Sequence, residues 1–119
     1  MESIHYHQKL WPELKMIFAI PNGGNRNIVT AKKLKSEGVK AGVPDLFLPV
    51  ARGKYHGLFI EMKRCKDGRL SKPQEAWIKA LQEQGYQASV CKGCSEALLT
   101  LDKYLNQPDP EEMQKGFSQ

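Results

Sequence analysis

The chain has 119 residues, of which 40% are hydrophobic and 26% charged, as expected for a single soluble globular domain. No apolar run approaches the roughly 20 residues that span a bilayer, and the first residues do not resemble a signal peptide, so we expect no membrane partner. The formal net charge is +5, but residues 26–72 alone hold 12 Lys/Arg against 4 Asp/Glu. This basic segment favours a polyanion such as nucleic acid as partner, although a solvated lysine-rich surface explains the charge equally well.

The first third of the chain predicts a helix, a strand and a second helix. Residues 2–14 indicate a short helix that Pro12 interrupts. Residues 14–20 are mostly apolar and predict a buried strand, which the turn sequence Pro21-Asn22-Gly23-Gly24 ends. An apolar stripe opposite several lysines predicts a helix over 27–38.

The remaining elements are predicted by strand patterns and helix-capping residues. Two strands are expected at about 45–49 and 57–63, joined by a polar loop. Ser71 as N-cap and Pro73 in the first turn predict a helix to about Gln84. A strand over 86–91 and a helix over 95–105 follow.

The element order α-β-α-β-β-α-β-α predicts an α/β fold of the α+β type, with a central mixed sheet flanked by helices. We expect one domain over residues 1–106. Residues 107–119 offer little to bury, so we expect them to form a flexible C-terminal tail.

Charged residues interrupt the two central strands at Asp45, Glu61 and Lys63. Glu61 and Lys63 are two residues apart, so both side chains leave the same face of a strand. Asp45 becomes their neighbour if the two strands form a hairpin. Taken singly, Asp45 as a turn residue and Glu61 with Lys63 as an exposed pair are the simpler interpretations. Taken together in strands that are otherwise apolar, they predict a compensated buried carboxylate.

Two carboxylates and a backbone carbonyl are suitable ligands for Mg²⁺ or Mn²⁺. We expect Asp45, Glu61 and the Met62 carbonyl to bind such a metal. Lys63 would then orient or help to deprotonate the attacking water, or offset the charge on a pentacovalent phosphate.

These residues resemble a known family. Pro44-Asp45 followed by Glu61-X-Lys63 is similar to the PD-(D/E)XK nuclease signature. The flanking segments make the resemblance to the VRR-NUC family of virus-type replication and repair nucleases more specific, over about residues 14–105. Those segments are Phe18 to Gly24, Glu37 to Asp45, Tyr55 to Lys63 and Leu70 to Trp77.

The resemblance implies a restriction-endonuclease-like core and metal-dependent, structure-selective cleavage of DNA. It also implies a homodimer acting on branched DNA such as four-way junctions, in the cytoplasm of a bacterial host that carries a phage or prophage gene. By the same resemblance, Asp45 and Glu61 are metal ligands, Lys63 is the catalytic lysine and Gln74 steadies the active site.

The basic segment offers candidate contacts to the DNA backbone that carry no sequence preference. They are Asn22, Arg26, Lys32, Lys33, Lys35, Arg52, Lys54, Arg64, Lys66 and Arg69. His56 is as well explained by packing on Tyr55 as by a phosphate contact.

The N-terminus departs from the family pattern. Family members begin with a longer amphipathic helix that brings an acidic residue and a glutamine to the metal, and here Glu2 and Gln8 are the only candidates in the first eleven residues. Two alternatives to the enzyme therefore stay open. The chain is a catalytically impaired DNA-binding module, or a metal-binding assembly subunit that does not touch DNA.

The three cysteines cannot all pair within one chain, so we expect reduced thiols. Cys91 and Cys94 have C-X-X-C spacing, but no second pair completes a zinc site.

Overall fold

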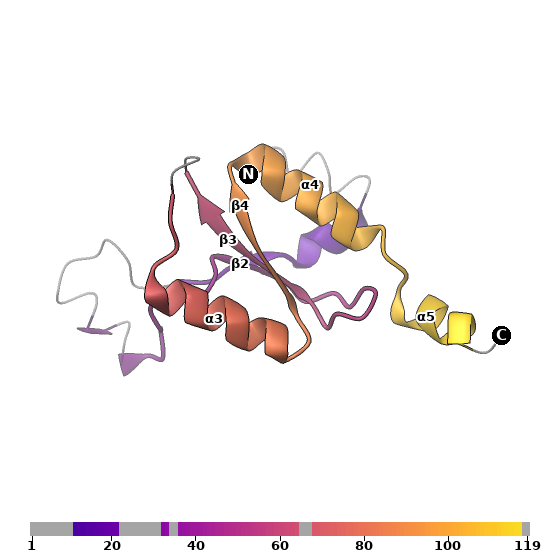
Figure 1. Ribbon diagram of the computed structural model, residues 1–119, viewed down its shortest axis with the longest axis horizontal. Coiled ribbons are helices and arrows are strands. Elements are labelled where there is room, and N and C mark those ends of the chain that lie inside the picture. The colour runs from indigo at the N-terminus through magenta and orange to yellow at the C-terminus, as the bar shows by residue number, and fades with distance from the viewer. Residues whose placement is uncertain (1–10, 22–31, 34–35, 65–67, 118–119) are drawn as a thin grey trace.

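The computed structural model describes residues 11–21, 32–33, 36–64 and 68–117, and centres on a four-stranded mixed sheet. The strands are ordered β1-β2-β3-β4, and their bounds are β1 (Phe18–Ala19), β2 (Leu46–Leu48), β3 (Leu58–Lys63) and β4 (Gln87–Lys92). Neighbouring strands are antiparallel except β3 and β4, which are parallel. Figure 1 shows helices α3 (Lys72–Glu83) and α4 (Cys94–Leu105) on opposite faces of this sheet. The predicted mixed sheet with flanking helices is confirmed.

The hydrophobic core lies between the sheet and α4. Leu48, Leu58 and Ile60 project from the sheet and are fully buried against Leu101 and other apolar residues of α4. Tyr104 of α4 is also buried, and its hydroxyl donates a hydrogen bond of 2.6 Å to the Val50 carbonyl. Burial raises the pKa of Tyr104 to about 12, so this hydroxyl stays a donor at neutral pH. Because successive side chains of a strand point to opposite faces, the residues that alternate with Leu48, Leu58 and Ile60 lie on the other face of the sheet, which α3 covers.

Helix α3 begins and ends where the sequence predicts. Ser71 is the N-cap, and its side chain accepts from the backbone N–H of Gln74, while the Gln74 side chain accepts from the Ser71 N–H. These reciprocal hydrogen bonds form a capping box that satisfies two donors at the helix N-terminus. Gln84 is the C-cap, and Gly85 follows with φ of +92°, a conformation that favours glycine.

The beginning of the chain differs from the prediction. A 3₁₀ helix, η1 (Pro12–Met16), occupies the start of the expected strand over 14–20, and only Phe18 and Ala19 pair with β2. Within η1 only Leu14 is buried. The apolar residues over 14–20 therefore do not form a buried strand, and of η1 only Leu14 enters the core.

Other predictions concern parts of the chain that the structure describes incompletely. Residues 1–10 of the expected first helix lie outside the described residues, as does most of the helix expected over 27–38. Residues 32–33 and 36 of that helix are helical. The C-terminal segment contains a helix, α5 (Pro110–Phe117), where no element was predicted, and the flexibility of this tail stays a prediction. In the part of the chain that the structure describes, no helix has the length and apolar character needed to cross a membrane.

Candidate active site

The antiparallel register of β2 and β3 places Asp45 opposite Glu61. Leu46 pairs with Ile60, so the residues one step outward on each strand face each other. Asp45 is fixed at this position by two backbone contacts. Its side-chain Oδ2 accepts from the Met62 N–H at 2.8 Å, and its carbonyl accepts from the Ile20 N–H at 2.7 Å. The hairpin that the sequence predicted therefore brings the two carboxylates together.

A close approach between the Gly42 backbone and α3 leads the chain into this position. Gly42 has φ of +90°, and a Cβ atom there would lie 2.8 Å from the Pro73 carbonyl carbon. Only glycine combines that conformation with that contact. The loop thus packs on the first turn of α3, with Pro44 buried just before Asp45. Sequence reasoning missed this role of Gly42, although a glycine two residues before Pro44-Asp45 was a usable signal.

Glu61 is a buried carboxylate with an incomplete set of partners. Its side chain is 2% exposed, and its Oε1 has no hydrogen-bond partner among the described residues. Burial raises the pKa of Glu61 to about 8, and the neighbouring Asp45 carboxylate adds to the rise, whereas Lys63 opposes it. Two carboxyl groups in such a place need a shared proton or a cation between them.

Lys63 reaches the same corner from the same face of β3, two residues beyond Glu61. Its Nζ donates to Gln74 Oε1 at 2.9 Å. The same oxygen accepts from the Ser71 N–H, so the capping box of α3 fixes the amide that holds the lysine. The structure therefore brings together all four residues predicted to be catalytic: Asp45, Glu61, Lys63 and Gln74.

The carboxylates of Asp45 and Glu61 fit a divalent metal ion, because Glu61 is buried beside Asp45 and its Oε1 has no hydrogen-bond partner among the described residues. The predicted ligands are few: Asp45, Glu61 and the Met62 carbonyl. Among residues 11–21, 32–33, 36–64 and 68–117, no group of three or more His, Cys, Asp or Glu side chains is placed to hold a metal. Glu2 and Gln8, the predicted substitutes for ligands from the first helix, lie outside those ranges.

The candidate DNA contacts do not share one surface. Lys32, Lys33, Arg64 and Arg69 are exposed. Arg52 is largely covered and lies 3.7 Å from Glu13 in an ion pair, and the Lys54 ammonium lies 5.6 Å from the centre of the Tyr55 ring. Both of these residues belong to the loop before β3, at the opposite end of that strand from Lys63. Asn22, Arg26, Lys35 and Lys66 lie outside the described residues.

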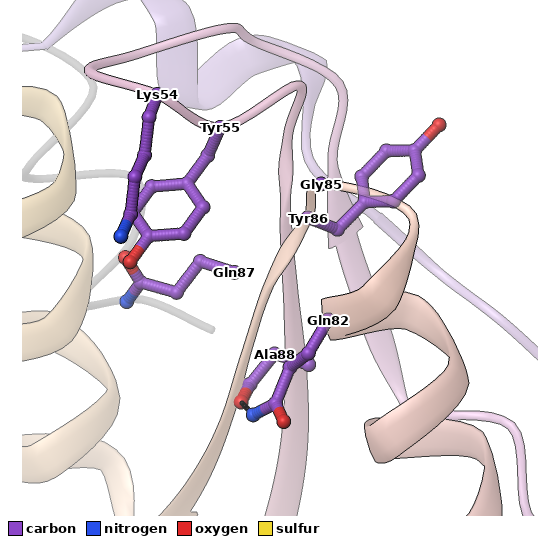
Figure 2. A pocket seen from close by; sticks show the side chains of 7 residues that line it. All are labelled: Lys54, Tyr55, Gln82, Gly85, Tyr86, Gln87 and Ala88. Carbon is purple, nitrogen blue, oxygen red and sulfur yellow. Dashed lines mark hydrogen bonds between the residues drawn. The ribbon is translucent and has the colours of Figure 1, made fainter.

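A surface pocket of about 460 Å³ also lies away from the carboxylates. Figure 2 shows Lys54, Tyr55 and Gln87 on one side of β4 and Gln82 of α3 on the other. The Gln82 side chain donates to the Ala88 carbonyl at 3.2 Å. None of the four predicted catalytic residues lines this pocket, so it is separate from the candidate active site.

The cysteines do not form a site in the described part of the chain. Cys91 is buried and Cys94 exposed, and both are free thiols. Cys91 contacts the Thr100 hydroxyl at 3.4 Å, and burial raises the pKa of its thiol, which makes the thiol less reactive. Cys65 lies outside the described residues.

Comparison with known proteins places the chain in one family. A family described as the VRR-NUC domain matches residues 4–95. A solved structure described as a VRR_NUC domain protein is 30% identical, with a TM-score of 0.70 over 91% of this chain and 89% of that chain. A search of curated proteins found no match.

Proposed function

This chain belongs to the VRR-NUC family of nuclease-type domains, and on that basis we propose that it is a metal-dependent endodeoxyribonuclease of the PD-(D/E)XK type. The observation that carries the proposal is the buried pair of Asp45 and Glu61, with Lys63 held beside it by Gln74. A carboxylate pair is suited to hold a divalent metal for phosphodiester hydrolysis, and an adjacent ammonium group is suited to stabilise developing negative charge. The unpartnered oxygen of Glu61 supports a cation bound at this place.

In this proposal, Asp45, Glu61 and the Met62 carbonyl bind Mg²⁺ or Mn²⁺. When bound, the metal supplies Lewis-acid polarisation of the phosphate and lowers the pKa of water. The protein contributes the fixed position of the ligands. The Met62 N–H holds Asp45, and the burial of Glu61 excludes water that would weaken its charge interactions.

Lys63 is the residue that acts on the water or on the phosphate. An ammonium group has three donors, and one of them is directed to Gln74 Oε1. Among the described residues, its hydrogen bond to Gln74 leaves other donors to orient the attacking water and to stabilise charge that develops on the phosphate oxygens. Gln74 is a positioning residue, because it acts through Lys63.

Branched DNA is the proposed substrate, bound by the exposed basic residues, with a homodimer as the proposed assembly. Lys32, Lys33, Arg64 and Arg69 would contact phosphates without reading bases. A two-fold dimer would present two active sites to a symmetric four-way junction. Expression from a phage or prophage gene in a bacterial cytoplasm stays a prediction.

A DNA-binding module without cleavage is the second candidate function. It is favoured by the small number of metal ligands in the described part of the chain, which provides two carboxylates at this site. Such a protein would bind branched DNA through the same basic residues and leave it intact.

Cleavage of labelled DNA separates the two functions. The purified protein is incubated with a four-way junction and with a linear duplex of matched sequence, in Mg²⁺, in Mn²⁺ or in EDTA. The nuclease is supported if nicking requires metal, is lost in Lys63→Ala and persists in the control Lys79→Ala, which removes an exposed lysine of α3. Binding without cleavage, equal in both variants, would support the module instead.

A further inference from the structure

A row of three aromatic side chains lies on the face of the sheet that carries the carboxylates. Phe18 of β1 pairs with Phe47 of β2, which pairs with Phe59 of β3. The rings of Phe47 and Phe59 are stacked with centroids 4.2 Å apart, and the Phe18 ring meets Phe47 edge-on at 5.7 Å. A Cβ atom on Gly57 would lie 2.8 Å from the Phe47 ring, so this glycine leaves room for the row.

The aromatic row runs directly alongside the carboxylates. Phe47 and Asp45 are two residues apart on the β2 side, and Phe59 and Glu61 are two apart on β3, so each pair shares a face of the sheet. Two residues along a strand correspond to about 7 Å. A strand of DNA with its phosphate at the carboxylates therefore has its neighbouring nucleotides within reach of the aromatic row, since stacked nucleotides rise about 3.4 Å each.

Phe18 is the exposed member of this row. Its side chain is 51% exposed, whereas Phe47 and Phe59 are partly covered. It lies on β1, an outer strand of the described sheet, and its ring is anchored on one side by the edge-on contact with Phe47. An anchored aromatic ring with an open side is a platform on which a planar group can stack.

We propose that Phe18 stacks on an unpaired base of the DNA substrate beside the scissile phosphate, and so selects DNA that contains unpaired nucleotides. The proposal rests on the nuclease function proposed above. Bases of an intact duplex are stacked on each other and offer no free face to Phe18, whereas an unpaired base at a branch does. The net charge of +5 favours a polyanion such as DNA over an apolar partner.

The test measures binding in EDTA, where cleavage does not interfere. Fluorescence anisotropy gives the Kd of the full chain for a forked duplex with unpaired arms and for a linear duplex of matched sequence. Because stacking on an aromatic residue contributes about 1–3 kcal/mol per base, we expect Phe18→Ala to weaken binding of the fork about 5- to 150-fold. Binding of the linear duplex should change less than about twofold, since it has no base to lose.

Two further variants separate stacking from loss of apolar surface. Phe18→Trp keeps a ring and should retain binding of the fork. Met16→Ala removes a side chain that is also 51% exposed and should leave both Kd values unchanged. The fluorescence of a 2-aminopurine placed beside the fork should change on binding of the wild type and not on binding of Phe18→Ala.

The following results would overturn the proposal. Equal weakening of fork and duplex by Phe18→Ala would show a general contact, and an unchanged Kd for the fork would show that Phe18 does not touch it. Loss of self-association in Phe18→Ala, measured by sedimentation, with unchanged binding per subunit would assign the ring to a second copy of the chain. If the wild type cleaves DNA while Phe18→Ala prefers the fork over the linear duplex as strongly as the wild type does, only the stacking role fails. If the wild type binds no DNA, the nuclease function fails with it.

Discussion

Replacing Glu61 by glutamine should flatten the pH dependence of stability in the metal-free protein. The pKa of Glu61 rises from 4.5 to about 8 in the folded protein, because the side chain is buried and lies beside Asp45. Between these two pKa values, the folded state therefore holds a proton on Glu61 that the unfolded state has released. This contribution to stability is fully present below pH 4.5 and is lost as the pH rises through about 8.

The size of the effect follows from the two pKa values. Between about pH 5 and about pH 8, the wild type should lose about 3 kcal/mol of unfolding free energy through this group. For a chain of this length the loss corresponds to roughly 10 °C in Tm. The amide of Glu61→Gln has no titrating proton, and it can still donate to Asp45 as the protonated acid does. The variant should therefore lack this loss.

Thermal unfolding in EDTA over this pH range is the assay, with Glu83→Gln as the control because Glu83 is exposed on α3. At about pH 8, added Mg²⁺ should stabilise the wild type and Glu83→Gln more than Glu61→Gln, since binding to the folded state alone raises stability. Parallel pH profiles for the wild type and Glu61→Gln would refute the reasoning, because they would show that this carboxyl does not hold a proton at neutral pH.

Three more variants test other contacts. Gln74→Ala should slow cleavage about tenfold, because Lys63 loses the hydrogen bond that positions it. The control is Ser71→Ala, which weakens the helix cap but keeps the Gln74 side chain. Equal cleavage rates in the two variants would contradict a positioning role for Gln74. Tyr104→Phe should lower the free energy of unfolding by about 1–3 kcal/mol in urea, because the Val50 carbonyl loses a buried partner, and an unchanged midpoint would contradict this. The double variant Arg64→Ala/Arg69→Ala should reduce the slope of log Kd against log salt by about 2, and an unchanged slope would place both residues away from the phosphates.

The second half of the fold was predictable because its signals are local. Ser71 and Gln74 form the capping box within one turn of the chain, and Glu61 and Lys63 stand two residues apart in β3. That spacing, with a hairpin, predicted that Asp45, Glu61 and Lys63 would meet. These inferences needed no knowledge of distant contacts.

The first described residues were mispredicted because apolar composition does not distinguish a strand from a single turn that fills the core. Leu14 is the one fully buried residue among residues 11–21, while Met16 and Phe18 are each 51% exposed. Whether an apolar residue of this segment is buried depends on its contacts with α4 and the sheet, which lie far away in the sequence. The Gly42–Pro73 approach and the aromatic row likewise depend on segments far apart in the sequence.

The most direct test of the central claim is the single-turnover rate of DNA cleavage at increasing Mg²⁺ in Asp45→Asn. Because a metal contributes several kcal/mol to such a reaction, we predict that the variant is slower than the wild type by at least about 100-fold at every concentration. Glu83→Gln, purified in parallel, should cleave at the wild-type rate. Cleavage by Asp45→Asn at the wild-type rate, with the same dependence on Mg²⁺, would contradict the assignment of this carboxylate pair as the metal site of a nuclease.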